Sequence, residues 1–392
     1  MVAGRPTLYL VFDQLPKKKD GGLVATYINF VQQFSDEIDI KLVSAFSNGE
    51  NDIEAFDQIE IIDLSPYVLD NRFFRCFSYL KRKEFRRFFH AIVSGVRFFG
   101  FVPIARKKTN RLFRDSMVIA VSPAAAMFIG NHVRFILEIH TKFEYFWGDN
   151  IIGRLQSSLA AKPALTVFRN KTDADKARPL FTSDFIYNGV EMPPHSSMVE
   201  RRKPFSALYV GGLVEHKNPL LLVRCAETVH RAIPEFTLDI YGVGELEETL
   251  RHEIEQRGLE KVVCLKGFVD DKSIYSRYEQ FWFSSKLEGF GLVIVEAMAN
   301  GTPVITTNWG DAVFEIVHDQ ITGFIVNDEE DFSKRAIALF ADEELRDKIA
   351  KAAYEDYARR FSTAQNKTAW EKILATVYPH LWRKAHKDRA SS

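Results

Sequence analysis

The stretch SKLEGFGLVIVEAMANGTPVI, residues 285–305, shows how this chain alternates its secondary structure. An apolar run ends just before it, Gly289 and Gly291 interrupt it, a second apolar segment spans 292–299, and a third run begins at Pro303. This order predicts a strand, a glycine-bearing loop, a buried helix and another strand. That sequence of elements is the repeating unit of a parallel sheet covered by helices.

The same alternation extends in both directions along the chain. Short apolar runs predict strands at Leu8–Phe12, Ile40–Ala45, Ile59–Ile62, Val118–Val121, Phe135–Ile139, Leu165–Phe168 and Phe185–Tyr187, then at Ala207–Val210, Phe236–Tyr241, Val262–Lys266, Gln280–Ser284, Pro303–Thr306 and Gly323–Val326. Amphipathic segments predict helices at Pro219–Ile233, Glu245–Arg257, Leu292–Asn300, Phe332–Ala341 and Thr363–Lys384. The fold class expected is α/β, with parallel, doubly wound sheets.

A break separates the two series of strands. Residues 188–197 combine an Asn-Gly turn, two prolines and small polar residues, which is typical of a domain boundary. We therefore expect an N-terminal domain over residues 1–190, a second domain over 191–365, and a C-terminal helix and tail over 366–392 that crosses back to the first domain.

Composition excludes several classes of protein. The chain has 392 residues, 46% of them hydrophobic and 27% charged, which excludes a disordered chain and suits two globular domains. Its formal net charge is zero, which argues against a dedicated nucleic-acid binder. Three widely spaced cysteines, Cys76, Cys225 and Cys264, favour a reducing cytoplasm over a disulfide framework or a zinc site. No apolar stretch is long enough to span a membrane, so the expected location is cytoplasmic, or peripheral on the inner face of the membrane.

Candidate ligand-binding residues follow from the topology, because parallel sheets bind ligands beyond the carboxyl ends of their strands. Gly289 and Gly291 would let the backbone approach a ligand, and the helix beginning at Leu292 would offer free N–H groups to a phosphate. Glu296 interrupts the apolar helix, and a buried acid needs a hydrogen-bonding partner. The hydroxyls of a ribose or sugar would serve; the alternative is a capping Glu288 and a Glu296 satisfied within the protein.

Glu288 and Glu296, with seven residues between them, resemble the E-x7-E motif of retaining glycosyltransferases of family 4, which have the GT-B fold. Further segments resemble that family over about residues 185–365: Ile186–Val190, Tyr209–Asn218, Asp239–Gly244, Lys266–Val269, Glu315–Val317 and Thr322–Val326. The resemblance implies two Rossmann-like domains facing a central cleft, with the donor nucleotide sugar held by the second domain.

The resemblance also implies roles for individual residues. Lys217 would pair with the donor diphosphate, Glu296 would accept hydrogen bonds from the ribose, and Glu288 would contact the transferred sugar. Without the resemblance, the alternatives are that Lys217 is a surface lysine and that His140 is a structural histidine. Many members carry an arginine where this chain has Gly212, so a phosphate-pairing charge is missing here. The catalytic residues implied are Glu288, His140 and Lys217; the donor-binding residues implied are Gly21, Gly22, Gly212, Lys217, Gly242, Gly244, Phe268, Val269, Glu288, Gly289, Phe290, Gly291, Leu292 and Glu296.

The activity implied is a retaining, metal-independent transfer of the hexosyltransferase type that needs no cofactor. The co-substrate would be a nucleotide-diphosphate sugar, with UDP as the expected nucleotide, and the acceptor a saccharide, lipid-linked or part of a growing cell-surface polysaccharide. Two alternatives remain open: a catalytically degenerate GT-B partner subunit, and another GT-B enzyme such as a nucleotide-sugar epimerase or a glycan synthase.

The zero net charge conceals one strongly basic block. Residues 72–114 hold 13 basic residues, one acidic residue and ten Phe. Residues 72–96 fit an amphipathic helix with Phe73, Phe77, Leu80, Phe85, Phe88, Phe89 and Ile92 on one arc and Arg72, Arg75, Arg82, Lys83, Arg86 and Arg87 on the other. This block could contact an anionic membrane surface, bind an acidic acceptor, or pack its Phe face on the sheet with its basic face solvated.

Overall fold

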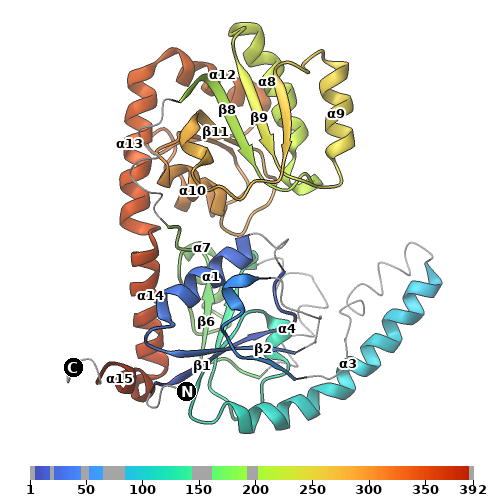
Figure 1. The fold of residues 1–392 in the computed structure, drawn as a ribbon, viewed down its shortest axis with the longest axis vertical. Coiled ribbons are helices and arrows are strands. Elements are labelled where there is room, and N and C mark those ends of the chain that lie inside the picture. The colour runs from blue at the N-terminus through green and yellow to red at the C-terminus, as the bar shows by residue number, and fades with distance from the viewer. Residues whose placement is uncertain are drawn as a thin grey trace. The chain divides into compact units, whose positions relative to one another are not determined.

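The structure is a computed structural model that describes residues 5–17, 22–45, 53–64, 84–143, 161–191 and 202–387. The chain forms two compact units (Figure 1). Unit 1 comprises residues up to Ile186 together with the segment from Lys367 onward, and unit 2 comprises Tyr187–Asn366. The chain thus passes between the units twice, at 186/187 and at 366/367.

Unit 1 contains a seven-stranded sheet in the order β3-β2-β1-β4-β5-β6-β7. Every pairing is parallel, which confirms the predicted sheet type. The strands are β1 (Thr7–Phe12), β2 (Asp39–Ser44), β3 (Ile61–Asp63), β4 (Met117–Ala120), β5 (Ile136–Ile139), β6 (Leu165–Phe168) and β7 (Ser183–Phe185).

The alternating side chains of β1 show how both faces of this sheet are covered. Leu8, Leu10 and Phe12 belong to one apolar cluster, and Tyr9 and Val11 belong to another on the opposite face. The first cluster is closed by α1 (Gly22–Phe34) and α14 (Thr363–Val377), and the second by α4 (Pro123–Ala126) and the C-terminal half of α3 (Phe85–Leu112). A sheet buried on both faces explains why its strands read as nearly continuous apolar runs.

Unit 2 contains a six-stranded parallel sheet in the order β10-β9-β8-β11-β12-β13. Its strands are β8 (Lys203–Val210), β9 (Thr237–Tyr241), β10 (Val263–Gly267), β11 (Tyr278–Phe283), β12 (Val304–Thr307) and β13 (Phe324–Val326). The covering helices are α8 (Pro219–Ala232), α9 (Glu247–Gln256), α10 (Leu292–Ala299), α11 (Val313–Ile316), α12 (Glu329–Ala341) and α13 (Glu343–Arg360). Each of the thirteen predicted strands overlaps a strand of the structure, and the described residues contain thirteen strands in all.

Both sheets reverse their strand order at one point. In unit 1 the reversal lies between β1 and β4, and in unit 2 it lies between β8 and β11. The connections that leave the carboxyl ends of two such strands pass to opposite faces of the sheet, which opens a crevice for ligands at that point. The reversals therefore locate a candidate site in each unit.

The C-terminal segment is part of the core of unit 1. Trp370 on α14 is only 2% exposed, and its ring meets Phe30 of α1 edge-on with the centroids 5.3 Å apart. The Tyr378 hydroxyl donates to the Val118 carbonyl at 2.8 Å. The single helix predicted over Thr363–Lys384 is wrong: α14 ends at Val377 and α15 (Pro379–Lys387) follows, because proline disfavours helical geometry in the residue before it.

The predicted end of the basic helix at residue 96 is also wrong. Helix α3 runs from Phe85 to Leu112 and includes Pro103, while residues 72–83 of the predicted helix lie outside the described residues. The expectation that its Phe face packs on the sheet is contradicted at Phe85 and Phe89, which are 59% and 65% exposed. The α3 side chains that the structure describes as packed in the core lie from Phe99 onward. Within the described ranges, no helix is both long and apolar enough to cross a bilayer.

We predict that Trp370→Ala lowers the free energy of unfolding of unit 1 by about 3–5 kcal/mol, because it empties a large volume between α1 and α14. Lys372→Ala, an exposed position on the same helix, is the matched control and should change stability by less than about 0.5 kcal/mol. Denaturant titration followed by circular dichroism measures both. Equal effects of the two substitutions would show that α14 is not part of this core.

Candidate functional site

The reversal point of unit 2 joins two loops that lie far apart in the sequence. The loop after β8 leads through Gly211 and Gly212 to a 3-10 turn at Glu215–Lys217, and the loop after β11 begins at Ser284. The Ser284 hydroxyl donates to the Lys217 carbonyl at 2.8 Å, and the Lys286 backbone N–H donates to the His216 carbonyl at 2.8 Å. These two bonds fix the loops against each other.

Lys217 and Glu288 meet at this junction. The Lys217 ammonium forms an ion pair with Glu288 Oε1, and the Ser285 hydroxyl donates to the same oxygen at 2.7 Å. The two side chains are 23% and 12% exposed, so neither is an ordinary surface charge. The structure therefore brings together two residues, 71 positions apart, that the sequence singled out separately.

Helix α10 begins directly after the glycine loop. Gly291 caps it in a left-handed conformation, with φ 78° and ψ 53°, which a glycine adopts without strain. The first N–H groups of a helix have no partner within the helix, so those of Leu292 and Val293 can bind an anion, whereas the Ile294 N–H donates to the Gly291 carbonyl at 2.9 Å. Phe290 differs from its neighbours, because its ring is buried and packs about 6 Å from the rings of Tyr187 and Phe361.

Glu296 lies inside α10 and is 4% exposed. The Tyr275 hydroxyl donates to its Oε2 at 2.6 Å, and the Lys272 ammonium lies 2.7 Å from its Oε1. Burial and the charge of Glu296 raise the pKa of Tyr275 well above 10, so the phenol stays a donor. The acid is thus satisfied within the protein, but one of its partners, Lys272, is 58% exposed and has room to move.

Gly242 and Gly244 are explained by packing of the protein on itself. A Cβ at Gly242 would lie 1.9 Å from the Gly211 carbonyl oxygen, and one at Gly244 would lie 2.3 Å from that of Leu213. The two glycines let the loop after β9 lie directly against the loop after β8, where the Leu213 N–H donates to the Val243 carbonyl at 3.0 Å.

Four further predicted residues surround this region of unit 2. Gly212 has open space around it, since the nearest atom to a Cβ there would be a Val214 methyl at 3.8 Å. Phe268 follows β10 and is 63% exposed, whereas Val269 is partly buried against the core. Gly289 lies between Glu288 and Phe290 in the loop that precedes α10.

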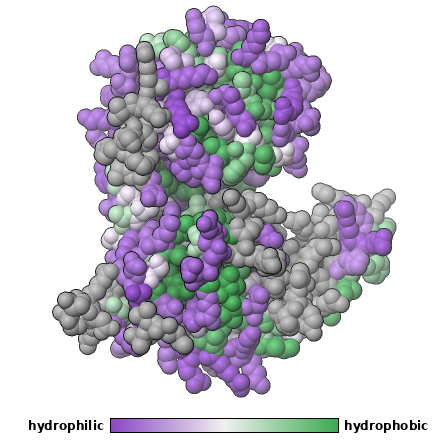
Figure 2. All heavy atoms as spheres, viewed as in Figure 1, coloured by the Kyte–Doolittle hydropathy of each residue, from purple (hydrophilic) through white to green (hydrophobic). Residues whose placement is uncertain are grey.

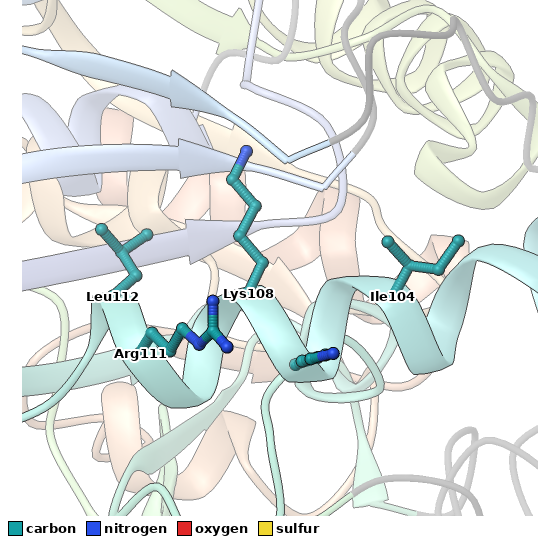
Figure 3. Close-up of a pocket in the computed structure, with 5 residues that line it drawn as sticks. Ile104, Lys108, Arg111 and Leu112 are labelled. Carbon is teal, nitrogen blue, oxygen red and sulfur yellow. The ribbon is translucent and has the colours of Figure 1, made fainter.

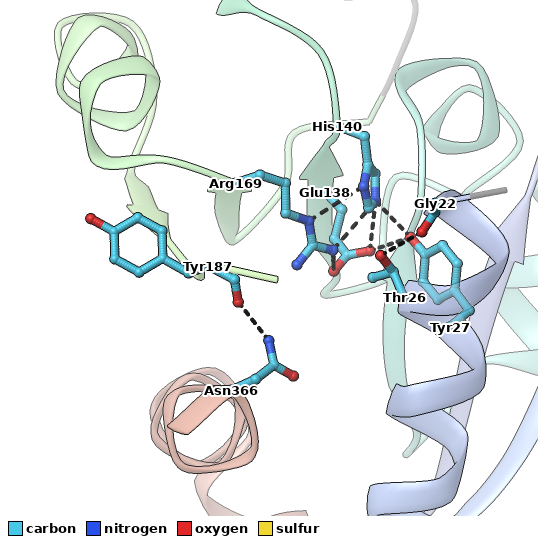
Figure 4. Close-up of polar contacts among 8 residues, drawn as sticks. All are labelled: Gly22, Thr26, Tyr27, Glu138, His140, Arg169, Tyr187 and Asn366. Atoms are coloured by element: carbon cyan, nitrogen blue, oxygen red, sulfur yellow. Dashed lines mark hydrogen bonds and ion pairs between the residues drawn. The ribbon is translucent and has the colours of Figure 1, made fainter. Parts of the chain in front are cut away.

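Unit 1 contains a second cluster, at the carboxyl ends of β5 and β6 (Figure 4). Glu138 is 1% exposed, and Arg169 Nη2 donates to its Oε1 at 2.5 Å. Tyr27, from α1, donates its hydroxyl to Glu138 Oε2 and lies 2.9 Å from His140 Nε2. Arg169 Nε in turn donates to His140 Nδ1 at 3.4 Å. The predicted His140 is therefore held by three polar side chains.

The charges in this cluster are set by their surroundings. Burial alone would raise the pKa of Glu138, but the Arg169 guanidinium and the hydrogen bonds from His140 and Tyr27 lower it to about 2. Burial and the Arg169 charge lower the pKa of His140 below its ordinary 6.5. At neutral pH Glu138 is a carboxylate and His140 a neutral imidazole. With Nδ1 accepting from Arg169, the imidazole proton resides on Nε2.

Gly22 is the first residue of α1, five residues before Tyr27, so this helix begins next to the cluster (Figure 4). The Thr26 hydroxyl donates to the Gly22 carbonyl at 2.9 Å. Gly21 lies outside the described residues.

Sequence reasoning missed Tyr27, Glu138 and Arg169 in unit 1, and Lys272 and Tyr275 in unit 2. A signal was present for two of them. Glu138 is an acid inside an apolar strand, and Arg169 directly follows the neighbouring strand, so charges of opposite sign end two adjacent parallel strands. Tyr27 and Tyr275 carried no such signal, because tyrosine is ordinary in an apolar face.

In the parts of the chain that the structure describes, no three His, Cys, Asp or Glu side chains lie together as a metal site would require. The charged residues at the loop junction of unit 2 and in the cluster of unit 1 are instead paired with one another or with tyrosine hydroxyls.

The segment Tyr187–Val190 holds the start of unit 2 to its end. The Asn366 side chain donates to the Tyr187 carbonyl at 2.7 Å, and the Val190 N–H donates to the Phe361 carbonyl at 2.8 Å. A Cβ at Gly189 would lie 2.7 Å from that of Asn366, so this close approach needs glycine. The residues at both passages of the chain between the units are thereby bonded together.

Part of this chain is similar in sequence to known glycosyltransferases. Residues 195–356 match the family model described as glycosyl transferases group 1. The GtfA subunit of a UDP-N-acetylglucosamine–peptide N-acetylglucosaminyltransferase from Streptococcus gordonii is 33% identical over 45% of this chain and 37% of its own length. A poly(glycerol-phosphate) alpha-glucosyltransferase from Bacillus subtilis is 32% identical over 40% of this chain and 24% of its own length. The chain thus spans well under half the length of these curated relatives.

Solved structures resemble the chain over nearly all of its length. A TarM mutant from S. aureus, in complex with fondaparinux, α-GlcNAc-glycerol and UDP, has a TM-score of 0.73 at 14% identity and covers 94% of this chain and 99% of its own. Anabaena HepE, in complex with UDP and glucose, has a TM-score of 0.71 at 18% identity and covers 95% of this chain and 100% of its own. The fold is GT-B, as predicted.

We predict that Glu138→Gln destabilises unit 1 by about 3–5 kcal/mol at neutral pH, because it leaves the buried Arg169 charge uncompensated. The folded-state pKa of Glu138 is depressed, so its contribution is complete above pH 4.5 and is lost as the pH falls towards 2. The difference between wild type and variant should therefore shrink over that interval. Hydrogen exchange of unit 1 peptides measures it.

Glu60→Gln is the control for this test, since Glu60 pairs with Lys41 in the same unit but is 58% exposed. It should cost less than about 1 kcal/mol. A Glu138→Gln variant as stable as wild type would contradict the assignment of Glu138 as the partner of a buried charge.

Proposed function

We propose that this chain is a retaining glycosyltransferase of the hexosyltransferase type that transfers a sugar from a UDP-sugar to a saccharide acceptor. The premise is the family match over residues 195–356. The observation that carries the proposal is the meeting of Lys217 and Glu288 at the strand-order reversal of unit 2, with Glu296 buried in the helix that starts there.

Lys217 is assigned to the donor diphosphate. A nucleoside diphosphate gains negative charge as it leaves the sugar, and a nearby ammonium stabilises that charge more in the transition state than in the ground state. The Glu288 pairing keeps Lys217 in place until the diphosphate takes over as its partner. Glu288 is then available to accept hydrogen bonds from the transferred sugar. The N–H groups at the start of α10 add donors for the same phosphate.

Glu296 is assigned to the ribose. Two neighbouring hydroxyls match the two oxygens of a carboxylate, and a ligand hydroxyl can replace Lys272 on Oε1 while Tyr275 stays on Oε2. In the same proposal Phe268, exposed at the end of β10, contacts the base.

His140 is assigned to the transferred sugar in its neutral form, with Glu138 and Arg169 holding its ring. Glu138 is ionised and so strongly paired that it is a poor proton acceptor. We assign deprotonation of the acceptor to the leaving phosphate, as in a retaining transfer without a catalytic base, and stabilisation of that phosphate to Lys217 and α10 rather than to a metal.

The acceptor is proposed to be a saccharide carried on a lipid, at the cytoplasmic face of a membrane, in the assembly of a glycan or cell-surface polysaccharide. One relative is named for poly(glycerol-phosphate), which supports a polymeric acceptor.

A second candidate is a non-catalytic partner subunit. It is favoured by Gly212, which leaves one position of the phosphate site without charge, and by a relative that is itself named as a subunit. Donor binding separates the two candidates, because a degenerate site would not select a nucleoside diphosphate.

We predict that Lys217→Ala weakens UDP binding at least tenfold, the cost of about 1.4 kcal/mol or more for a lost charge-assisted bond. Glu296→Ala should abolish both the measurable binding of UDP and the slow hydrolysis of a UDP-sugar. Isothermal calorimetry measures the affinity, and thermal unfolding reports whether each variant is folded. Lys348→Ala, an exposed lysine on α13, is the control and should bind as wild type does. Unaltered affinity in both site variants would overturn the proposal.

The open space at Gly212 provides a gain-of-function test. A Cβ at Gly212 meets no close contact, and Gly212→Arg places a guanidinium in the loop after β8, so UDP should bind about tenfold more tightly, while uridine, which has no phosphate, should bind as before. Gly212→Gln, a long neutral side chain, is the matched control. An equal change for UDP and uridine would place the diphosphate away from this loop.

A further inference from the structure

We propose that the solvent-facing side of α3, together with the basic pocket in its C-terminal half, binds the headgroups of anionic phospholipids. The inference deepens the proposed function, on which it rests for the link to a lipid-linked acceptor, by naming the surface that meets the membrane.

Helix α3 has a buried side and an outward side. Val102, Ala105 and Thr109 are buried in unit 1 and lie on one side of the helix. At 100° per residue, the opposite side carries Val93, Val96 and Ile104, followed by Lys107 and Arg111. The outward side therefore carries Arg86, seven residues before Val93, then these apolar residues, and is basic again near its C-terminus.

The apolar part is strongly exposed. Phe85, Val93, Val96 and Ile104 are 59%, 50%, 70% and 64% exposed. Figure 1 shows the N-terminal end of α3 projecting away from the sheet of unit 1, and Figure 2 shows hydrophobic residues along the outer edge of this helix. Large apolar side chains gathered on one exposed face mark an interaction surface rather than an ordinary solvated helix.

A pocket of about 490 Å³ lies against the basic part of the helix (Figure 3). Its lining consists of Ile104, Lys107, Lys108, Arg111 and Leu112. The Lys108 ammonium donates to the Asp63 carbonyl at 3.1 Å, which directs it towards the carboxyl end of β3. Three cations beside two aliphatic side chains suit a phosphate ester attached to an acyl chain.

The positive charge of residues 84–114 indicates which kind of partner binds this surface. Residues 84–114 carry eight basic residues and a single acid, Glu84, which is already paired with Arg87. A second copy of this chain would bring two such segments together, and their like charges would repel. A nucleic acid would satisfy the cations but offers no apolar surface for Val93 and Val96. An anionic bilayer satisfies both parts at once.

Pro103 lies between the two parts of α3. Proline removes one backbone hydrogen bond of the helix, so the exposed N-terminal part can tilt against the part fixed to the core. The geometry suits a helix that rests in the headgroup layer with its valines in the acyl boundary and its basic residues on the phosphates.

Flotation of the full chain with vesicles tests the inference. Vesicles in which part of the phosphatidylcholine is replaced by phosphatidylglycerol should bind the protein, vesicles of phosphatidylcholine alone should not, and added salt should weaken the binding. Lys107→Glu/Lys108→Glu/Arg111→Glu should weaken binding at least tenfold, and so should Val93→Ser/Val96→Ser.

Matched controls are Lys348→Glu/Lys351→Glu, exposed lysines of unit 2, and Leu180→Ser, an exposed leucine of unit 1 that is 58% exposed. Both should float as wild type does. Equal binding to both kinds of vesicle, or site variants that behave like the controls, would overturn the inference. So would a dimer, seen by sedimentation, that only Val93→Ser/Val96→Ser dissociates, or preferential binding of RNA.

Calorimetry with UDP separates this inference from the proposed function. A chain that binds UDP but not anionic vesicles fails only the lipid proposal. A chain that binds anionic vesicles but not UDP retains the lipid surface and loses the proposed transferase activity.

Discussion

The reversal of strand order in each parallel sheet is the constraint on which the rest of this structure depends. Because β8 and β11 are neighbours whose connections leave towards opposite faces, the loops after them meet, and Lys217 can pair with Glu288. Serine and backbone hydrogen bonds then hold the two loops together, and glycines let the loop after β9 lie against them. The topology of the sheet thus determines where the site lies, and the side chains of the two loops determine what it can bind.

Each unit contains a buried carboxylate that is held by a cation and by a tyrosine hydroxyl. Glu138 is paired with Arg169 and a tyrosine hydroxyl, and Glu296 with Lys272 and a tyrosine hydroxyl. The difference lies in exposure: Arg169 is 2% exposed and Lys272 is 58% exposed. A buried partner favours a fixed, structural role for Glu138, which positions His140. An exposed partner favours exchange for a ligand at Glu296.

Sequence periodicity predicted the strands well, since a sheet buried on both faces leaves short apolar runs that few other structures produce. The prediction from periodicity failed where the spacing of apolar residues along the chain does not match the helix ends or the packing of the folded chain. The prediction of a single helix over residues 363–384 is wrong because Pro379 divides this segment into two helices. The tyrosine partners of the two buried acids could not be predicted, because Tyr27 and Tyr275 reach them from other elements. The exposure of Phe85 also contradicts the packing that an amphipathic pattern favours.

The most direct test of the central claim is a structure of the chain with a bound UDP-sugar. We predict that the diphosphate lies between the loops after β8 and β11 in that structure. Lys217 should have left Glu288 for a phosphate oxygen, and a ribose hydroxyl should have replaced Lys272 on Glu296. A nucleotide bound elsewhere, with both ion pairs intact, would contradict it.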